Sequence, residues 1–174
     1  FIISLMVLIF LSGQAYSRDG GSFGVYGGVA IPGGDVAQYN GMGGHFGIIG
    51  RVATSNPLLR FAIGGSITRL SSEGKVVTYG DYHTLLEKEY NPISFFAGAQ
   101  LGNESGPYFM PAMTFNIAGS DPRFGLDWRF GALLPANENA SLDLGATLSI
   151  LNLINKETDE DMNTLLVFSL GIVF

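Results

Sequence analysis

Charged side chains set among apolar residues are the part of this 174-residue chain that could do chemistry. Charges in a low-dielectric interior are costly unless they are paired and hydrogen-bonded. We therefore expect these side chains to form a paired network with nearby polar groups. The predicted network consists of Arg51, Arg60, Gln100, Asn116, Asp127, Arg129 and Asp143, with Thr114 beside it.

Two interpretations of this network remain open. As structure, the paired charges would fix the alignment of neighbouring strands and close the interior. As function, the same ring of charges would line a thin ion path with a slight preference for anions. A wide diffusion pore is not expected, because porins use 16–18 strands.

Catalytic and cofactor chemistry find little support in the sequence. The chain has no Cys and contains neither a GxSxG nor an HExxH motif. His45 is expected to hydrogen-bond in the interior, and His83 falls in a loop. The acidic cluster at 157–161 lacks the ligand spacing of a calcium loop. We therefore expect no enzyme, no metal site and no cofactor.

Eight alternating segments must position the charged residues. Apolar side chains recur at every second position, which is the period of a strand, and each segment is long enough to cross a bilayer as a tilted strand. All six charges inside the segments lie at the alternate positions not used by the large apolar residues. The predicted strands are 22–30, 42–53, 58–68, 92–102, 107–118, 123–134, 140–150 and 164–174.

The connections alternate in length. Those at 54–57, 103–106 and 135–139 have the composition of tight turns, whereas 31–41, 69–91 and 151–163 are longer and 119–122 is a short exception. Short periplasmic turns and longer external loops are typical of outer-membrane barrels. The arm 75–90 is expected to be extended rather than helical and is tyrosine-rich, which makes it the best candidate for contact with a partner.

The composition favours a lipid-facing exterior. Hydrophobic residues make up 47% of the chain and charged residues 14%, and there are 25 glycines. A soluble lipocalin-like barrel that binds a small molecule is the alternative, but its exterior would carry more Lys and Glu. The net charge of −6 argues against nucleic acid, which requires a basic face.

The first residues resemble an export signal. The stretch 1–11 is uncharged and apolar, and small residues follow it up to Ser17. We expect residues 1–17 to be a cleaved signal peptide that lacks its basic start, and residues 18–174 to form one barrel domain.

The pattern, strand number, loop asymmetry and final phenylalanine resemble the eight-stranded bacterial outer-membrane β-barrels, the group of the OmpA transmembrane domain, OmpX and the opacity-type proteins. The resemblance implies an all-β, antiparallel up-and-down transmembrane barrel with both termini in the periplasm. It also implies that the last strand is read by the barrel-assembly machinery, through Leu166, Phe168, Leu170, Ile172 and Phe174.

From this resemblance we expect a monomer in outer-membrane lipid with a structural or surface-interaction role. An extracellular partner would meet loops 69–91 and 151–163. Aromatic belts at the two membrane interfaces are expected to include Trp128, Tyr108, Tyr90, Phe23 and Phe174.

Overall fold

The computed structural model describes residues 20–72, 75–79, 82–86, 90–103, 105–118, 121–154 and 162–174. The predicted signal peptide, 1–17, and the acidic cluster at 157–161 lie outside the described residues.

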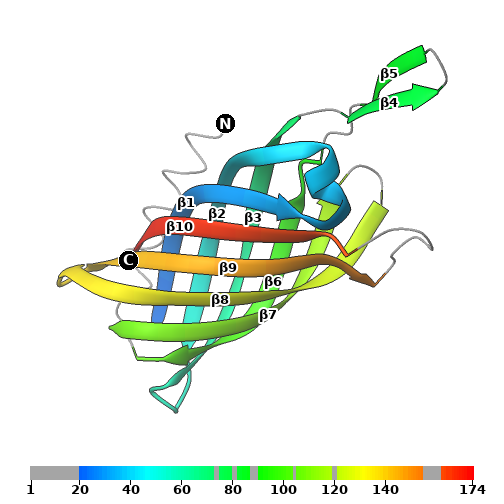
Figure 1. The fold of residues 1–174 in the computed structure, drawn as a ribbon. Helices are drawn as coiled ribbons and strands as arrows, with labels where there is room; N and C mark the ends of the chain where they lie inside the picture. The colour runs from blue at the N-terminus through cyan, green and yellow to red at the C-terminus, as the bar shows by residue number, and fades with distance from the viewer. Residues whose placement is uncertain are drawn as a thin grey trace, which may run out of the picture.

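Eight long strands close into a single antiparallel barrel, which confirms the predicted fold class (Figure 1). Neighbouring strands follow the chain in an up-and-down order, and the ring runs β1-β10-β9-β8-β7-β6-β3-β2. The barrel strands are β1 (Gly21–Gly33), β2 (Asn40–Ala53), β3 (Leu59–Ser72), β6 (Ile93–Gly102), β7 (Gly106–Ala118), β8 (Asp121–Asn137), β9 (Ala140–Ile154) and β10 (Thr164–Val173).

The first and last strands seal the ring. Pairs run from Gly24 with Val173 to Gly33 with Thr164. Beyond them, Phe23 and Phe174 exchange two backbone hydrogen bonds, with N···O distances of 3.0 and 2.7 Å. Closure gives the backbone N–H and C=O groups at both strand edges hydrogen-bond partners. A lipid environment requires this, because lipid offers these groups no other partner.

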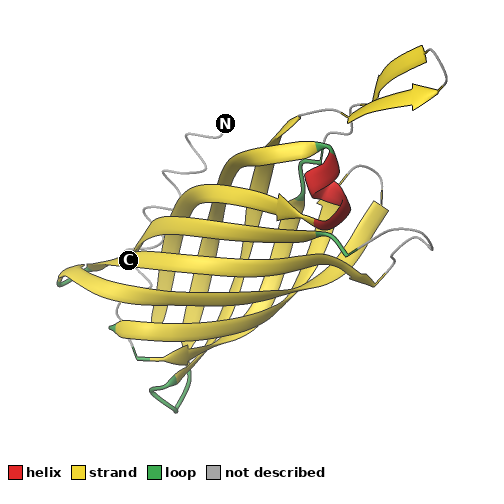
Figure 2. Ribbon diagram, viewed as in Figure 1, coloured by secondary structure: helices red, strands yellow, loops and turns green. Residues whose placement is uncertain are grey.

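The two ends of the barrel differ. The connections 54–58, 103–105 and 138–139 between consecutive strands are short, whereas the opposite end carries the 3-10 helix η1 (Gly34–Gln38) and a second sheet. That sheet pairs β4 (Lys75–Tyr79) with β5 (Tyr82–Leu86) and projects beyond the barrel, on the same end as η1 (Figure 2). The arm is thus extended, as predicted. Within the described residues, no helix is both long and apolar enough to span a membrane.

The apolar and polar faces are the reverse of those of a lipocalin. Large apolar side chains point outward and are exposed, among them Phe46, Phe61, Ile63, Met113 and Phe168. Charged and amide side chains such as Arg51, Gln100, Arg129 and Asp143 point inward and are buried. Arg69 is an exception to the predicted alternation, because β3 runs beyond the predicted segment and Arg69 is exposed within it. Lipid is the solvent that suits such an exterior.

Glycines on the inner face make room for aromatic rings in this narrow barrel. A Cβ at Gly131 would lie 2.5 Å from the Tyr108 ring, and one at Gly47 would overlap the Tyr26 ring. Each glycine stands directly opposite its ring in the neighbouring strand. Cross-strand packing against aromatic rings therefore explains the glycines at these two positions.

Candidate functional site

Asp143 is the centre of a buried ionic network near the short-turn end of the lumen. Its Oδ2 lies 2.7 Å from Arg51 Nη2 and 3.2 Å from Arg129 Nη2. Gln100 joins through its Oε1, which accepts a 2.6 Å hydrogen bond from Arg51 Nε. All four residues are at most 2% exposed. The structure thus brings together four of the seven predicted residues, from strands β2, β6, β8 and β9.

Two tyrosines join the network. The Tyr108 hydroxyl donates a 2.6 Å hydrogen bond to Asp143 Oδ1 and accepts a 2.8 Å bond from Arg129 Nε. The Arg129 guanidinium also lies 4.5 Å from the centre of the Tyr26 ring, in cation–π geometry. Because two arginines share one carboxylate, the tyrosines supply the further acceptor and π surface that the second guanidinium needs.

Sequence reasoning missed the role of Tyr108, which was assigned to an aromatic belt. Tyr108 is 5% exposed in the lumen, and Tyr90, also assigned to a belt, is 8% exposed near the opposite end. Both belt assignments are wrong. The signal was present in the sequence, since Tyr108 shares the alternate positions of Thr114 and Asn116, which were expected to face inward.

Three predicted residues lie apart from Asp143. Asn116 donates hydrogen bonds of 3.0 Å to Thr114 Oγ1 and 2.9 Å to the Leu151 carbonyl. Asp127 stands opposite Ser149 in the β8–β9 ladder and is hydrogen-bonded to it. Arg60 is buried at the short-turn mouth, in the wall of a polar cavity of about 300 Å³.

The middle of the lumen is nearly full. Here His45 is buried, with its Nδ1 2.8 Å from Thr68 Oγ1 and its ring stacked against Tyr26. A cavity of about 20 Å³ lies beside them, with Asp127 and Arg129 in its wall. That volume holds about one water molecule.

Apolar side chains pack beneath η1 at the loop end of the lumen. Val36 of this helix packs in a buried cluster with Ala30, Leu70, Tyr90, Leu151, Leu165 and Val167. Asparagines hold the helix in place. Asn163 Oδ1 accepts a 3.2 Å bond from the Val36 amide, and Asn40 Nδ2 donates a 3.1 Å bond to the Val36 carbonyl.

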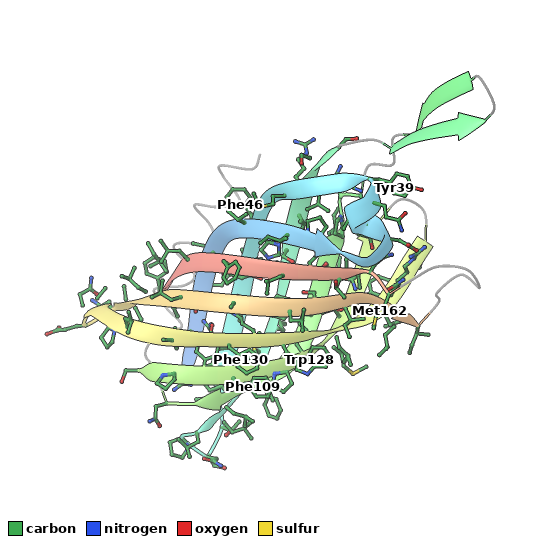
Figure 3. All side chains as sticks on the ribbon, viewed as in Figure 1. Tyr39, Phe46, Phe109, Trp128, Phe130 and Met162 are labelled. Atoms are coloured by element: carbon green, nitrogen blue, oxygen red, sulfur yellow. The ribbon has the colours of Figure 1, made fainter. Side chains whose placement is uncertain are left out.

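Two aromatic pairs lie on the outer face of β7 and β8. Phe109 stacks on Phe130 with ring centres 4.8 Å apart, and Phe115 meets Phe124 edge-on at 5.3 Å. Trp128 lies near the Phe109–Phe130 pair (Figure 3). Its outward position agrees with the prediction that it faces the bilayer.

The residues predicted as an assembly signal lie on the outer face of β10. Leu166, Phe168, Leu170 and Ile172 are 38–56% exposed, while the alternating Leu165, Val167, Ser169 and Val173 are buried. Phe174 directly follows the strand and pairs with Phe23.

Comparisons with solved structures find the same fold. Neisserial surface protein A (NspA) matches with a TM-score of 0.66 and 16% identity, over 88% of this chain and 96% of that chain. Ail, the attachment invasion locus protein of Yersinia pestis, matches with a TM-score of 0.54 and 12% identity, over 90% and 100%. A second Ail structure, in complex with the heparin analogue sucrose octasulfate, matches with a TM-score of 0.53 and 15% identity, over 88% and 99%.

No protein-family model matches the sequence, and no curated protein matches it. The structural likeness spans nearly the whole of both neighbours and includes the closed ring of eight strands. This chain therefore has the fold of the eight-stranded bacterial outer-membrane β-barrels, the fold that it shares with NspA and Ail.

Proposed function

We propose that this protein is an outer-membrane barrel that binds a partner outside the cell and whose lumen does not conduct. The proposal rests on the contrast between the lumen of the barrel and the sheet β4–β5 that projects from it. Two buried clusters and an ionic network fill much of the lumen, and a separate sheet projects from the loop end (Figure 1). The fold of NspA and Ail, both surface or attachment proteins by name, supports the outer-membrane location and the surface role.

The lumen contents support a closed barrel over a narrow channel. An ion entering from the short-turn end meets the Arg51–Asp143–Arg129 network, whose members hold one another at 2.7 and 3.2 Å. Past the central cavity, it meets the apolar cluster under η1. Neither region offers an ion a hydrated route, and desolvating an ion is costly.

The projecting sheet is the proposed contact surface. In the described part of the chain, β4 and β5 pair only with each other, so each strand has one edge without a neighbour. A free strand edge can accept an extended segment of another protein by β-augmentation. The loop at 151–163 would flank this contact.

A protein partner suits this chain better than a sulfated polysaccharide. Sucrose octasulfate was bound to Ail, and such a polyanion requires a basic surface. This chain carries a net charge of −6, with four acidic residues at 157–161 of one external loop. Repulsion would therefore oppose a dense polyanion.

Two further features belong to the proposal. Residues 1–17 would direct export and be removed, and the outer face of β10 would be recognised during assembly through Phe168 and its neighbours. The barrel would be monomeric.

Planar-bilayer recordings and a binding assay test the function together. We expect the folded wild type to give no stable conductance, and Arg129→Gln to behave likewise because the apolar cluster remains. Stable wild-type conductance that Arg129→Gln alters would refute the closed lumen. Replacing 73–89 by a short Gly-Ser turn should abolish adhesion of barrel-bearing vesicles to partner cells, and replacing 54–57 should not. Equal adhesion by the two variants would refute the role of the sheet.

A further inference from the structure

A gap in the backbone ladder marks the outer wall between β6 and β7. Pairs run from Ile93 with Ile117 to Gly98 with Ala112 and resume at Leu101 with Phe109. The register on the two sides of the gap is the same, so Ala99 faces Pro111 across it. Both missing pairs would need a hydrogen bond from the amide of residue 111, and proline has no N–H to give.

A proline at this place breaks a general rule of sheet structure. Proline is normally confined to edge strands, strand starts or bulges, but a closed barrel has no edge and Pro111 lies in the middle of β7. Such departures from local rules are expected at functional positions, where another gain offsets the loss. The outer surface at the gap has a feature that could offset the loss of these backbone hydrogen bonds.

An apolar groove of about 450 Å³ lies on the outer face over this gap. Its floor has small side chains, Ala97 and Ala99, beside the Pro111 ring, and its walls include Phe61, Met113 and Trp128. The volume falls within the range of small-molecule pockets, about 300–1,000 Å³. Asp127 also contributes to the lining of the groove, but its carboxyl is hydrogen-bonded to Ser149 and the residue forms part of the wall of the lumen cavity.

We propose that this groove binds one acyl chain of a phospholipid. The groove is continuous with the lipid-facing band of exposed residues, such as Phe61 and Met113, so its surroundings are hydrocarbon. A slender flexible chain can fill a depression floored by alanines and recover the dispersion contacts that an unfilled groove would lose.

The position of the groove indicates which leaflet supplies the lipid. Ala99 is three residues from the end of β6, next to the short turn, and Pro111 is in the half of β7 that starts from that turn. The short turns mark the periplasmic side. The lipid would therefore come from the periplasmic leaflet, which consists of phospholipid.

The only tryptophan of the chain makes a direct test available. Trp128 forms part of the groove wall, so its fluorescence reports a brominated acyl chain bound there. Phospholipid with dibrominated chains is titrated into the full, folded barrel in detergent micelles. We expect quenching that saturates at one lipid per barrel, while lipid that merely mixes with the micelle quenches in proportion to its mole fraction.

Three variants complete the experiment. Ala99→Phe fills the groove and should convert saturable quenching into proportional quenching. Ile48→Phe adds a ring to the outer face of β2 and should bind as the wild type does. Pro111→Ala restores the missing amide donor, so the barrel should unfold at a higher temperature and lose the saturable phase. If Ala99→Phe fails to fold, Pro111→Ala still tests the proposal.

Proportional quenching in the wild type would overturn the proposal. So would saturable quenching that survives in a folded Ala99→Phe or Pro111→Ala barrel. Trp128 emission that depends on protein concentration instead, with dimers in sedimentation that Ala99→Phe abolishes, would assign the groove to a second copy of the chain.

Discussion

Removing the Asp143 charge should destabilise the barrel more than any other single change of charge. Asp143→Asn keeps the shape of the side chain and an oxygen that can accept from Tyr108. It removes the negative charge that lies 2.7 Å from Arg51 and 3.2 Å from Arg129. What remains is two guanidiniums, 1% and 2% exposed, with no shared counter-charge.

The size of the effect follows from this burial. Breaking a buried ion pair by removing one partner costs about 3–5 kcal/mol, because the other charge stays in the interior uncompensated. Here one carboxylate serves two cations, so the decrease in the free energy of unfolding should lie near the upper end of that range. Arginine cannot avoid this cost by becoming neutral, because its guanidinium stays protonated.

Reversible urea unfolding in lipid vesicles, followed by Trp128 fluorescence and by the gel shift of unboiled protein, measures the loss. Glu138→Gln, an exposed charge in a short turn, is the control and should change stability by less than ~0.5 kcal/mol. Asp143→Asn combined with Arg51→Met should regain ~1 kcal/mol or more, because it removes one uncompensated charge. A loss below ~1 kcal/mol for Asp143→Asn, or additive losses in the double variant, would refute the reasoning.

Four further outcomes are expected. Gly131→Ala should lower the unfolding free energy by ~1–3 kcal/mol through overlap with Tyr108, and Gly50→Ala, whose added Cβ has its nearest contact at 3.9 Å, should not; equal losses would contradict the packing role of Gly131. Ile63→Arg, on the lipid face, should cost ~2–4 kcal/mol in vesicles, and Leu58→Arg, in a turn, much less; tolerance of both would argue against a lipid-facing Ile63. Asn163→Ala should speed hydrogen exchange at the Val36 amide without changing exchange at Phe23, because only the first amide bonds to Asn163; unchanged exchange at Val36 would mean that η1 is held otherwise. Fractionation should place the protein with outer membranes, with a gel mobility that changes on boiling, whereas a soluble protein unaffected by boiling would rule out the membrane barrel.

Alternation in the sequence was enough to predict the faces of the strands. Arg51, Arg129 and Asp143 were assigned to the interior from position alone, and the structure buries all three. Alternation could not predict which of them meet, because contact depends on the register of strands that are far apart in the chain. Arg51 reaches Asp143 across the lumen, from β2 to β9.

Local chemistry explains the features that the sequence did not reveal. Tyr108 was misassigned because residue type was given more weight than position. The helix η1 was read as a loop, since its five residues are too few for a periodic pattern and it is held by distant asparagines such as Asn163. The ladder gap at Pro111 requires the β6–β7 register, which no single segment contains.

The junction of β1 with β10 has a consequence for how the protein acquires its structure. These strands come from opposite ends of the described chain, so their pairing closes the largest loop of any contact in the barrel. Closing a long loop costs entropy before the new contacts repay it, and such topologies fold slowly. Until that pairing forms, β1 and β10 each expose an edge of backbone groups that lipid cannot satisfy. The unclosed barrel is therefore the species most prone to aggregation, and the rate at which β1 and β10 pair determines its lifetime.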